Sequence, residues 1–513
     1  MRRKIGLMCL VALAACSSEG EPAGGPADPT SLSEPIATGI AIAEVAMFQS
    51  LKFPLANAGA AAPSGRVPLV AGRDALLRVY VKPEAGWSAK PVTARLKLVT
   101  ESPTGTFTKL LSATKTVSGA STEADLESTL NVPIPGAFLQ QEARYVVVLN
   151  EAGGTPPSAA PSPARFPQDG ALAPLGARGA GESLRVTLVP VEYRADGSGR
   201  LPDTTDEQVR RYREMLYKLY PVARVEVTVH APFVWSEPVA ASGKGLSELL
   251  AAIGQLRRSE NPPNNVYYYG AVNPADTFDA FCRGGCTTGL SPTGAAHSVG
   301  VGFGGEGGRG DKSAETAAHE IGHAHNLRHA PCGGAGGPDP EYPSDADHAG
   351  AKIGVWGYNL ITKKLVDPGG AEPPKDLMAY CRPSWISDFH YAKLLERVRS
   401  DHELLAGRSP GAAEADEYDG YLVEATGVIT PKGVSSRSWE LARGEAHALA
   451  WLGPTGARLG PDGTPRAGAV VRYFPYDHLP GGELWVPRAP AGAVAAEVVG
   501  LGREPSRLVV RPQ

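Results

Sequence analysis

The residues with the clearest chemical potential lie at 318–329, which read Ala-His-Glu-Ile-Gly-His-Ala-His-Asn-Leu-Arg-His. His319 and His323 are four residues apart, so on an α-helix they project from one face, about one turn apart. Two imidazoles at this spacing suit a tetrahedral Zn²⁺ ion, which in catalytic sites takes three protein ligands and a water molecule. Glu320, beside the first histidine, is then placed to act as a general base.

The same short pattern also occurs on solvated helix faces, so a third ligand is needed to separate the two interpretations. His329 follows six residues after His323 and is the candidate. His325 is not expected to bind the metal, because a residue two positions after His323 points to the opposite side of the helix.

With His329 included, the segment resembles the zinc-binding motif HExxHxxGxxH of the metzincin metallopeptidases. The family has glycine where this chain has Asn326, and asparagine adopts the left-handed conformation more readily than most residues. The family also has a methionine turn beneath the metal, and Met378 in the Pro-flanked segment 376–381 matches it. Tyr380 resembles the tyrosine that follows this methionine in some members, where it binds zinc or steadies the oxyanion.

This resemblance implies a zinc-dependent endopeptidase with one catalytic zinc ion. It implies that His319, His323 and His329 hold the metal, and that Glu320 and Tyr380 are catalytic. The likeness is greatest to the secreted bacterial group that includes mucin-cleaving proteases, so the expected substrates are extracellular proteins, with glycoproteins or mucins among them. The alternative is a non-enzymatic surface lipoprotein that binds a partner through its β domains, and the intact Glu320 argues against it.

Substrate contacts are expected on a rim of small and aromatic residues. The glycine-rich stretch 300–305, with Gly302 and Gly304, is interpreted as an edge strand or flexible rim that an extended peptide joins by main-chain hydrogen bonds. Trp356 and Tyr358, between the histidines and the methionine, are expected across the cleft. The stretch formally matches a dinucleotide-binding pattern, but no helix opens directly on it.

The chain contains six cysteines. Cys9 lies in an apolar N-terminal stretch and Cys16 directly after it, so neither is expected to form a disulfide. The other four cysteines are an even number, which favours two disulfides in an exported protein. Since the resemblance places the methionine turn under the metal, Cys332 and Cys381 should be neighbours and form one bridge. Cys282 and Cys286 would then form a short local bridge.

Residues 1–15 combine a basic start with a short apolar run and are interpreted as a signal peptide. The sequence Leu-Ala-Ala-Cys ending at Cys16 resembles a bacterial lipobox, which predicts lipidation of Cys16 and a flexible tether over 16–35. Ordinary signal cleavage near an accidental cysteine is the alternative. The expectation is an exported protein anchored by lipid at the bacterial outer membrane or cell surface, with no other membrane contact.

The elements that must position these residues suggest a division into several domains. Short β-like runs separated by Gly and Pro predict an immunoglobulin-like β-sandwich over 36–150, and a Pro/Ala/Gly-rich linker follows over 151–181. Alternating strands and helices over 182–408 predict an α/β metzincin catalytic domain. A return to β-like runs over 409–513 predicts a second, C-terminal β-sandwich.

The composition and the remaining charged residues point to no further function. The net charge is −4 at pH 7 and no basic cluster stands out, so nucleic-acid binding is not expected. The acids Asp339, Glu341, Asp345 and Asp347 offer Ca²⁺ ligands, but their spacing fits no EF-hand, so Ca²⁺ is unsupported. The remaining histidines, including His478, lack ligand spacing and are interpreted as structural or surface residues. A monomer is expected.

Overall fold

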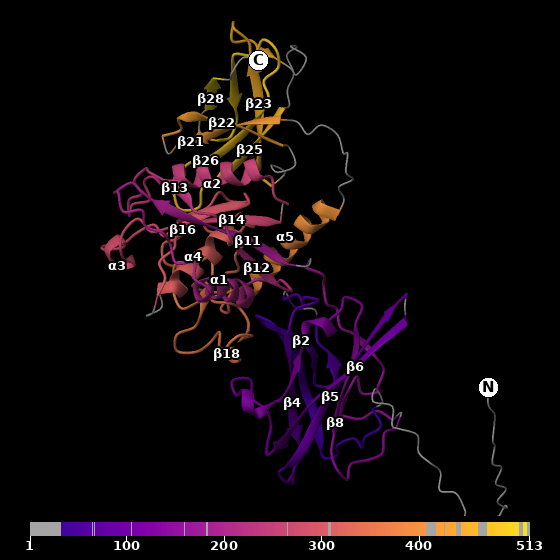
Figure 1. Cartoon of the computed structure of the whole chain (residues 1–513). Coiled ribbons are helices and arrows are strands. Elements are labelled where there is room, and N and C mark those ends of the chain that lie inside the picture. Colours follow the sequence, from indigo (N-terminus) through magenta and orange to yellow (C-terminus); the bar gives the residue numbers. More distant parts are fainter. Residues whose placement is uncertain are drawn as a thin grey trace, which may run out of the picture.

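A computed structural model describes the chain over residues 32–509, apart from 64, 66, 104, 159, 181–182, 264, 306–308, 407–416, 425, 438–442, 460–468 and 502–505. The chain forms three successive units, and the central one lies between the other two (Figure 1). The expected signal peptide, Cys16 and most of the tether lie outside the described residues. None of the described helices is long and apolar enough to cross a membrane.

The N-terminal unit consists of two antiparallel sheets that share one core. The first sheet has the order β3 (Ala60–Ala61), β2 (Lys52–Asn57), β1 (Ile40–Phe48), β4 (Ala75–Pro83) and β7 (Leu130–Ile134). The second has the order β10 (Ala173–Pro174), β8 (Arg144–Asn150), β5 (Lys90–Ser102) and β6 (Gly105–Val117), and β9 (Arg165–Phe166) also pairs with β8. Inward-facing residues at every second position of β5, such as Leu96 and Leu98, meet Val45 and Val79 of the other sheet in this core. Two single-turn helices, η1 (Leu126–Ser128) and η2 (Gly136–Phe138), complete the unit.

The segment 151–181 is more than a linker. Its residues form β9 and β10, which pair with β8 and so extend the second sheet. Phe166 is buried in the shared core, where it packs against Tyr145 with ring centroids 6.1 Å apart. Its Pro and Gly content indicated loop, but short strands of two residues do not need a continuous run of β-forming residues.

The central unit is built on a mixed sheet. The order is β12 (Val225–Val229), β11 (Leu184–Tyr193), β14 (Val266–Val272), β16 (His297–Val301) and β15 (Gly289–Leu290), and β13 (Phe233–Trp235) also pairs with β11. All neighbours run parallel except β15, which is antiparallel to β16 and forms the edge. The helices are α1 (Asp206–Leu219), α2 (Leu246–Glu260), α3 (Phe278–Phe281), α4 (Arg309–Ala324) and α5 (Asp388–Ala406). Two small pairs of strands lie between α4 and α5, namely β17 (Gly357–Asn359) with β18 (Lys364–Val366), and β19 (Lys375–Asp376) with β20 (Ser384–Trp385).

The alternation of side chains along β14 explains how both faces of this sheet are covered. Tyr267 and Tyr269 point into the apolar core formed with α1 and α4. Tyr268 points the other way, into the cluster formed with α2. The sheet therefore holds α4 against one face.

The C-terminal unit is one antiparallel sheet. Its order is β22 (Ile429–Arg437), β21 (Glu417–Val423), β26 (Gly482–Pro487), β25 (Ala469–Pro475), β23 (Glu445–Leu452), β27 (Ala495–Val498) and β28 (Ser506–Val509), and β24 (Arg458–Leu459) also pairs with β23. The sheet curls into a nearly closed barrel.

The predicted fold class is therefore wrong. The structure is mostly β, with 38% strand and 16% helix, and contains several antiparallel sheets; over the residues that it describes there is no α/β metzincin arrangement. The expected C-terminal sandwich is a curled single sheet. The physical reason is that short apolar strands bounded by turns have the same local pattern in a sandwich and in a barrel, because pairing partners are set by contacts distant in sequence.

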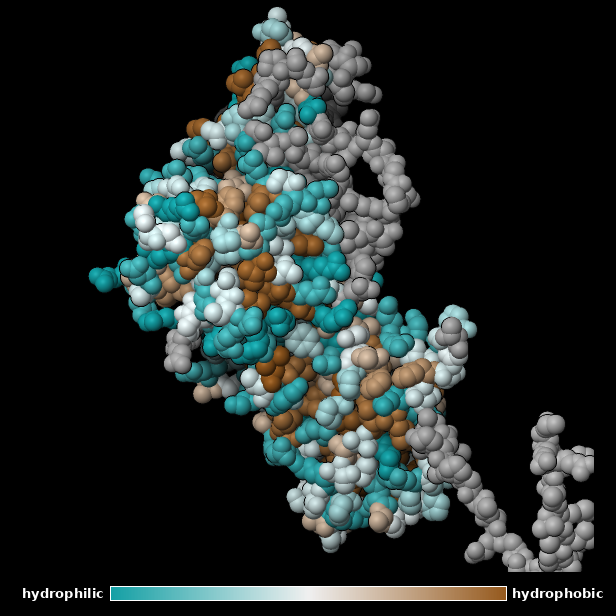
Figure 2. Space-filling model, viewed as in Figure 1, coloured by the Kyte–Doolittle hydropathy of each residue, from teal (hydrophilic) through white to brown (hydrophobic). Residues whose placement is uncertain are grey.

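Buried polar contacts join the three units. Between the first two, the guanidinium of Arg73 is fully buried, and its Nη1 donates to the carbonyl of Val222 at 2.9 Å. Between the last two, Glu483 of β26 accepts from His297 of β16 at 3.2 Å and pairs with Lys432 at 2.5 Å. On the face shown in Figure 2, hydrophilic residues cover much of all three units, with apolar patches among them.

Candidate metal centre

Helix α4 and the turn after it bring the three expected histidines together. His319 and His323 lie on its last turns, and the helix ends at Ala324. Asn326 then adopts φ 69°, in the left-handed region, which reverses the chain and returns His329 to the same place. His325 projects away and stacks on Tyr267 with ring centroids 4.2 Å apart.

A backbone carbonyl fixes the orientation of each ring. The Nδ1 atoms of His319, His323 and His329 lie 2.8, 2.8 and 2.6 Å from main-chain oxygens, and these oxygens belong to Leu377, Leu327 and Gly336 respectively. A carbonyl oxygen only accepts, so each Nδ1 must carry the proton. In a neutral imidazole the other nitrogen, Nε2, then has a free lone pair.

These three Nε2 atoms converge. The Nε2 of His323 lies 3.1 Å from that of His319 and 3.2 Å from that of His329. Burial, the largest cause, lowers the pKa of His323 to about 3 and also lowers the pKa values of His319 and His329. Three neutral, buried nitrogens that face one another without a proton between them form a site for a cation, and imidazole nitrogen is a preferred ligand of zinc.

Residues 376–381 pack against α4 and contact the histidine cluster. The carbonyl of Leu377 orients His319, and Met378 is fully buried, with its carbonyl accepting from Ala330 at 3.0 Å. Helix α4 has Gly322 over this methionine, because an added Cβ would lie 2.7 Å from the Met378 sulfur. The expected methionine turn therefore lies directly against the helix that carries His319 and His323.

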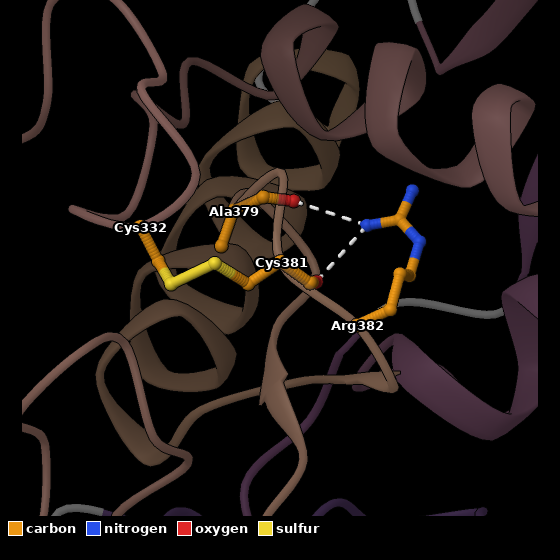
Figure 3. The surroundings of a disulfide bond; sticks show 4 residues. All are labelled: Cys332, Ala379, Cys381 and Arg382. Carbon is orange, nitrogen blue, oxygen red and sulfur yellow. Dashed lines mark hydrogen bonds between the residues drawn. A yellow bond between two sulfur atoms is a disulfide. The ribbon is translucent and has the colours of Figure 1, made fainter.

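Both expected disulfides are formed, and one of them ties this turn to the histidine loop. Cys332 is bonded to Cys381 across a sequence separation of 49 residues, and Cys282 to Cys286 across 4. Beside the first bridge, the Arg382 guanidinium donates to the carbonyls of Ala379 and Cys381, both at 3.2 Å (Figure 3). The bridge fixes the position of Tyr380, the residue between Ala379 and Cys381.

Two side chains beside the histidines are able to take part in acid–base chemistry. The hydroxyl of Tyr380 lies 3.4 Å from Nε2 of His329, and the residue is 39% exposed. The carboxyl of Glu320 is buried, and burial, followed by the charge of Asp477, raises its pKa well above the usual value. Gly289 of β15 leaves room for it, since an added Cβ would lie 2.4 Å from Oε1 of Glu320.

Asp477 and His478 enter the site from the C-terminal unit, which the sequence did not predict; His478 had been interpreted as a structural or surface residue. An Oδ2 atom of Asp477 lies 3.3 Å from Nε2 of His323. His478 Nε2 donates to Oε1 of Glu320 at 3.1 Å, and its Nδ1 bonds the hydroxyl of Tyr380. Burial opposes the charge of His478, but the carboxylates of Asp477 and Glu320 overcome this and raise its pKa well above the usual value.

Together, the five side chains form one compact cluster of residue types that are able to bind a metal ion. One ligand atom from each of His319, His323, His329, Asp477 and His478 lies within 4.8 Å of every other. Because His478 and Asp477 are about 150 residues from the motif in sequence, no local spacing pointed to them. The only local signal was an Asp-His pair in a Pro- and Gly-bounded turn.

The expected substrate rim is arranged differently. Strand β16 pairs with β14 on one side and β15 on the other, so Gly289–Leu290, rather than the stretch 300–305, forms the edge. Gly302 and Gly304 instead lie against the loop before α1, where an added Cβ would meet Pro202 and Asp203.

Trp356 and Tyr358 lie at the junction with the N-terminal unit. The carbonyl of Trp356 accepts from Lys52 at 2.8 Å, and the Tyr358 ring packs edge-on against Phe48 with centroids 6.3 Å apart. Within the described part of the chain, no contact joins either residue to the metal-binding groups. This packing explains the two aromatics as interface residues.

The acidic loop does not form a cation site. Asp339 and Glu341 both pair with Lys393, at 2.8 and 2.9 Å, and Asp345 bonds His348 at 2.7 Å. Among the described residues, the cluster at the α4 histidines is the one group that satisfies metal-binding geometry. Three of the four acids of this loop, Asp339, Glu341 and Asp345, are thus paired with basic side chains.

Compared with known protein families, the chain matches none, and a comparison with curated proteins also gives no match. The geometry of the site is therefore the basis for assigning a function.

Proposed function

We propose that the chain is a zinc-dependent endopeptidase. The observation that supports this best is the convergence of three neutral imidazole nitrogens next to the buried carboxyl of Glu320. A zinc ion held there supplies a Lewis acid and lowers the pKa of a bound water. The resemblance to the metzincins is limited to the motif at 319–329 and the turn at Met378.

Glu320 performs the proton transfers in this proposal. It follows His319 in the chain, and its carboxyl lies beside the histidine cluster, where a bound water would attack the carbonyl carbon of a substrate. It takes the proton from that water and passes it to the departing amine. Tyr380, whose hydroxyl lies 3.4 Å from His329, donates to the oxygen of the scissile carbonyl as charge develops on it.

The proposed substrates are proteins outside the cell, glycoproteins and mucins among them. Two disulfides are compatible with an extracellular location. Export by a signal peptide and anchoring through lipid on Cys16 complete the proposal. The competing function, partner binding by a surface lipoprotein, requires no carboxyl beside the histidines.

Zinc content and proteolysis together test the proposal. Wild type, Glu320→Gln, His329→Ala and Asp477→Asn are purified as full chains, analysed for zinc and incubated with casein and a mucin; Asp477→Asn removes a carboxylate beside the histidines. Glu320→Gln should keep the zinc and lose nearly all cleavage, whereas His329→Ala should lose zinc. Glu248→Gln, on the exposed side of α2, is the matched control. The proposal fails if neither zinc-loaded wild type nor zinc-loaded Asp477→Asn cuts a protein.

A further inference from the structure

The turn between β25 and β26, residues 476–481, is built into the metal centre. Asp477 Oδ1 accepts from the main-chain N–H of Ser291 at 2.8 Å, and its own N–H donates to the Ser291 carbonyl at 3.2 Å. Tyr476 and Leu479 pack into the apolar cluster with α2. The turn is therefore held by both hydrogen bonds and buried apolar contacts.

This turn pairs with the residues that directly follow β15, the edge strand of the central sheet. Ser291 directly follows β15, and the next residue, Pro292, forms an antiparallel bridge with Tyr476. The N–H of Thr293 donates to the carbonyl of Pro475 at 2.9 Å. A segment of the C-terminal unit thus uses main-chain groups beside Glu320 that an extended peptide would otherwise use.

The second oxygen of Asp477 points at the histidines. Its Oδ2 atom lies 3.3 Å from Nε2 of His323, and the side chain is 0% exposed. Within the described residues this oxygen accepts no hydrogen bond, although Nε2 of His478 is 2.9 Å away. Since the proton of His323 is on Nδ1, a carboxylate oxygen faces a nitrogen lone pair. Two buried acceptors this close need a cation between them.

His478 has a different role from Asp477. Its Nε2 lies between two carboxylates, 3.1 Å from Glu320 and 2.9 Å from Asp477. The negative charge of the Asp477 carboxylate favours a proton on this nitrogen, which then has no lone pair for a metal. His478 thereby occupies the carboxyl of Glu320 and, through Nδ1, the hydroxyl of Tyr380.

We propose that Asp477 is a fourth protein ligand of the metal and that the 476–481 turn holds the centre in a closed form. This rests on the proposed function only for the identity of the reaction. A zinc ion with four protein ligands has no position for a catalytic water. The same turn covers the metal, the base Glu320 and the oxyanion donor Tyr380, so hydrolysis requires the turn to withdraw.

Zinc affinity tests the ligand assignment without relying on activity. The full chain is titrated with zinc against a competing chelator as wild type, Asp477→Asn, His478→Ala and Asp419→Asn. Asp419, on β21, is the matched acidic control within the same sheet. Asp477→Asn should weaken zinc binding at least about tenfold. His478→Ala and Asp419→Asn should leave it close to that of wild type. Unchanged affinity in Asp477→Asn, or a larger loss in His478→Ala, overturns the assignment.

Casein hydrolysis by the same zinc-saturated proteins tests the closed form. Asp477→Asn should be faster than wild type, because the carboxylate no longer competes with water, and Asp477→Asn combined with Glu320→Gln should be inactive. A slower Asp477→Asn would show that the carboxylate assists the reaction, and the closed form would be abandoned. Loss of zinc affinity without hydrolysis by any variant would keep the fourth ligand and remove the peptidase function, so the two failures are separable.

Discussion

Main-chain carbonyls, rather than acidic side chains, orient the three histidines of the metal centre. Leu377, Leu327 and Gly336 each accept from one Nδ1. The sequence could show which histidines share a helix face, because that follows from helical periodicity. It could not show the tautomers, since the oxygens that fix them come from the backbone at positions where the residue type is irrelevant.

The catalytic role proposed for Tyr380 can be tested by removing its hydroxyl. Tyr380→Phe removes the hydroxyl next to His329, so kcat for a peptide substrate should fall by about 10²–10³ while KM changes little. Zinc content should stay that of wild type. Steady-state kinetics on zinc-saturated protein measure both constants.

Tyr358→Phe is the matched control, because this ring packs against the N-terminal unit. Its kinetics should equal those of wild type. A Tyr380→Phe protein with unchanged kcat would remove Tyr380 from the catalytic groups.

Among the elements, the short ones decide how the site is built. The longer elements were predictable in kind: the β-like runs expected over 36–150 include β4 (Ala75–Pro83), and the strands and helices expected over 182–408 include α5 (Asp388–Ala406). The two-residue edge strand β15 and the turn at 476–481 carry little pattern of their own. Their positions come from pairing with distant segments, which local propensity does not encode.

The Cys332–Cys381 bridge should stabilise the fold more than the Cys282–Cys286 bridge does. Replacing both cysteines by serine removes a constraint across 49 residues, which chain entropy values at about 4 kcal/mol of unfolding free energy. Replacing Cys282 and Cys286, which are 4 residues apart, should cost only about half as much. Denaturant unfolding of zinc-loaded proteins measures both. Equal losses would contradict the loop-length argument.

For the whole molecule, the sequence indicated which regions form strands but not how those strands pair into sheets. The C-terminal runs that predicted a sandwich pair instead into one curled sheet, and the 151–181 segment joins the N-terminal unit. Which strands become neighbours depends on long-range contacts. The contribution of the C-terminal unit to the metal centre has the same origin, because its docking on α2 is a tertiary contact.

That docking surface contains a buried ion pair, Glu483 with Lys432. Glu483→Ala leaves the Lys432 ammonium buried without a partner and should destabilise the chain by about 3–5 kcal/mol. Denaturant unfolding measures the loss. Glu497→Ala, which breaks a more exposed pair with Arg458, should cost no more than about 1 kcal/mol.

The pH dependence of this pair has a definite sign. Burial opposes the charge of Glu483, but Lys432 and His297 overcome it and hold the pKa of Glu483 well below the usual 4.5. A depressed pKa gives stability that is complete above the unfolded pKa and is lost as the pH falls through the folded one. Wild type should therefore lose the pair only in strong acid, and a loss near neutral pH would contradict the pairing.

Because Asp477 lies late in the sequence, the residues of the site are also synthesised in a fixed order. A ribosome completes the three histidines long before it reaches residue 477 of 513. A growing chain, or one truncated before the β25–β26 turn, has the residues of an open centre and lacks those that fill it. A recombinant fragment that stops at α5 therefore offers a different set of side chains to a metal ion from the 513-residue chain, and zinc affinities measured on one do not transfer to the other.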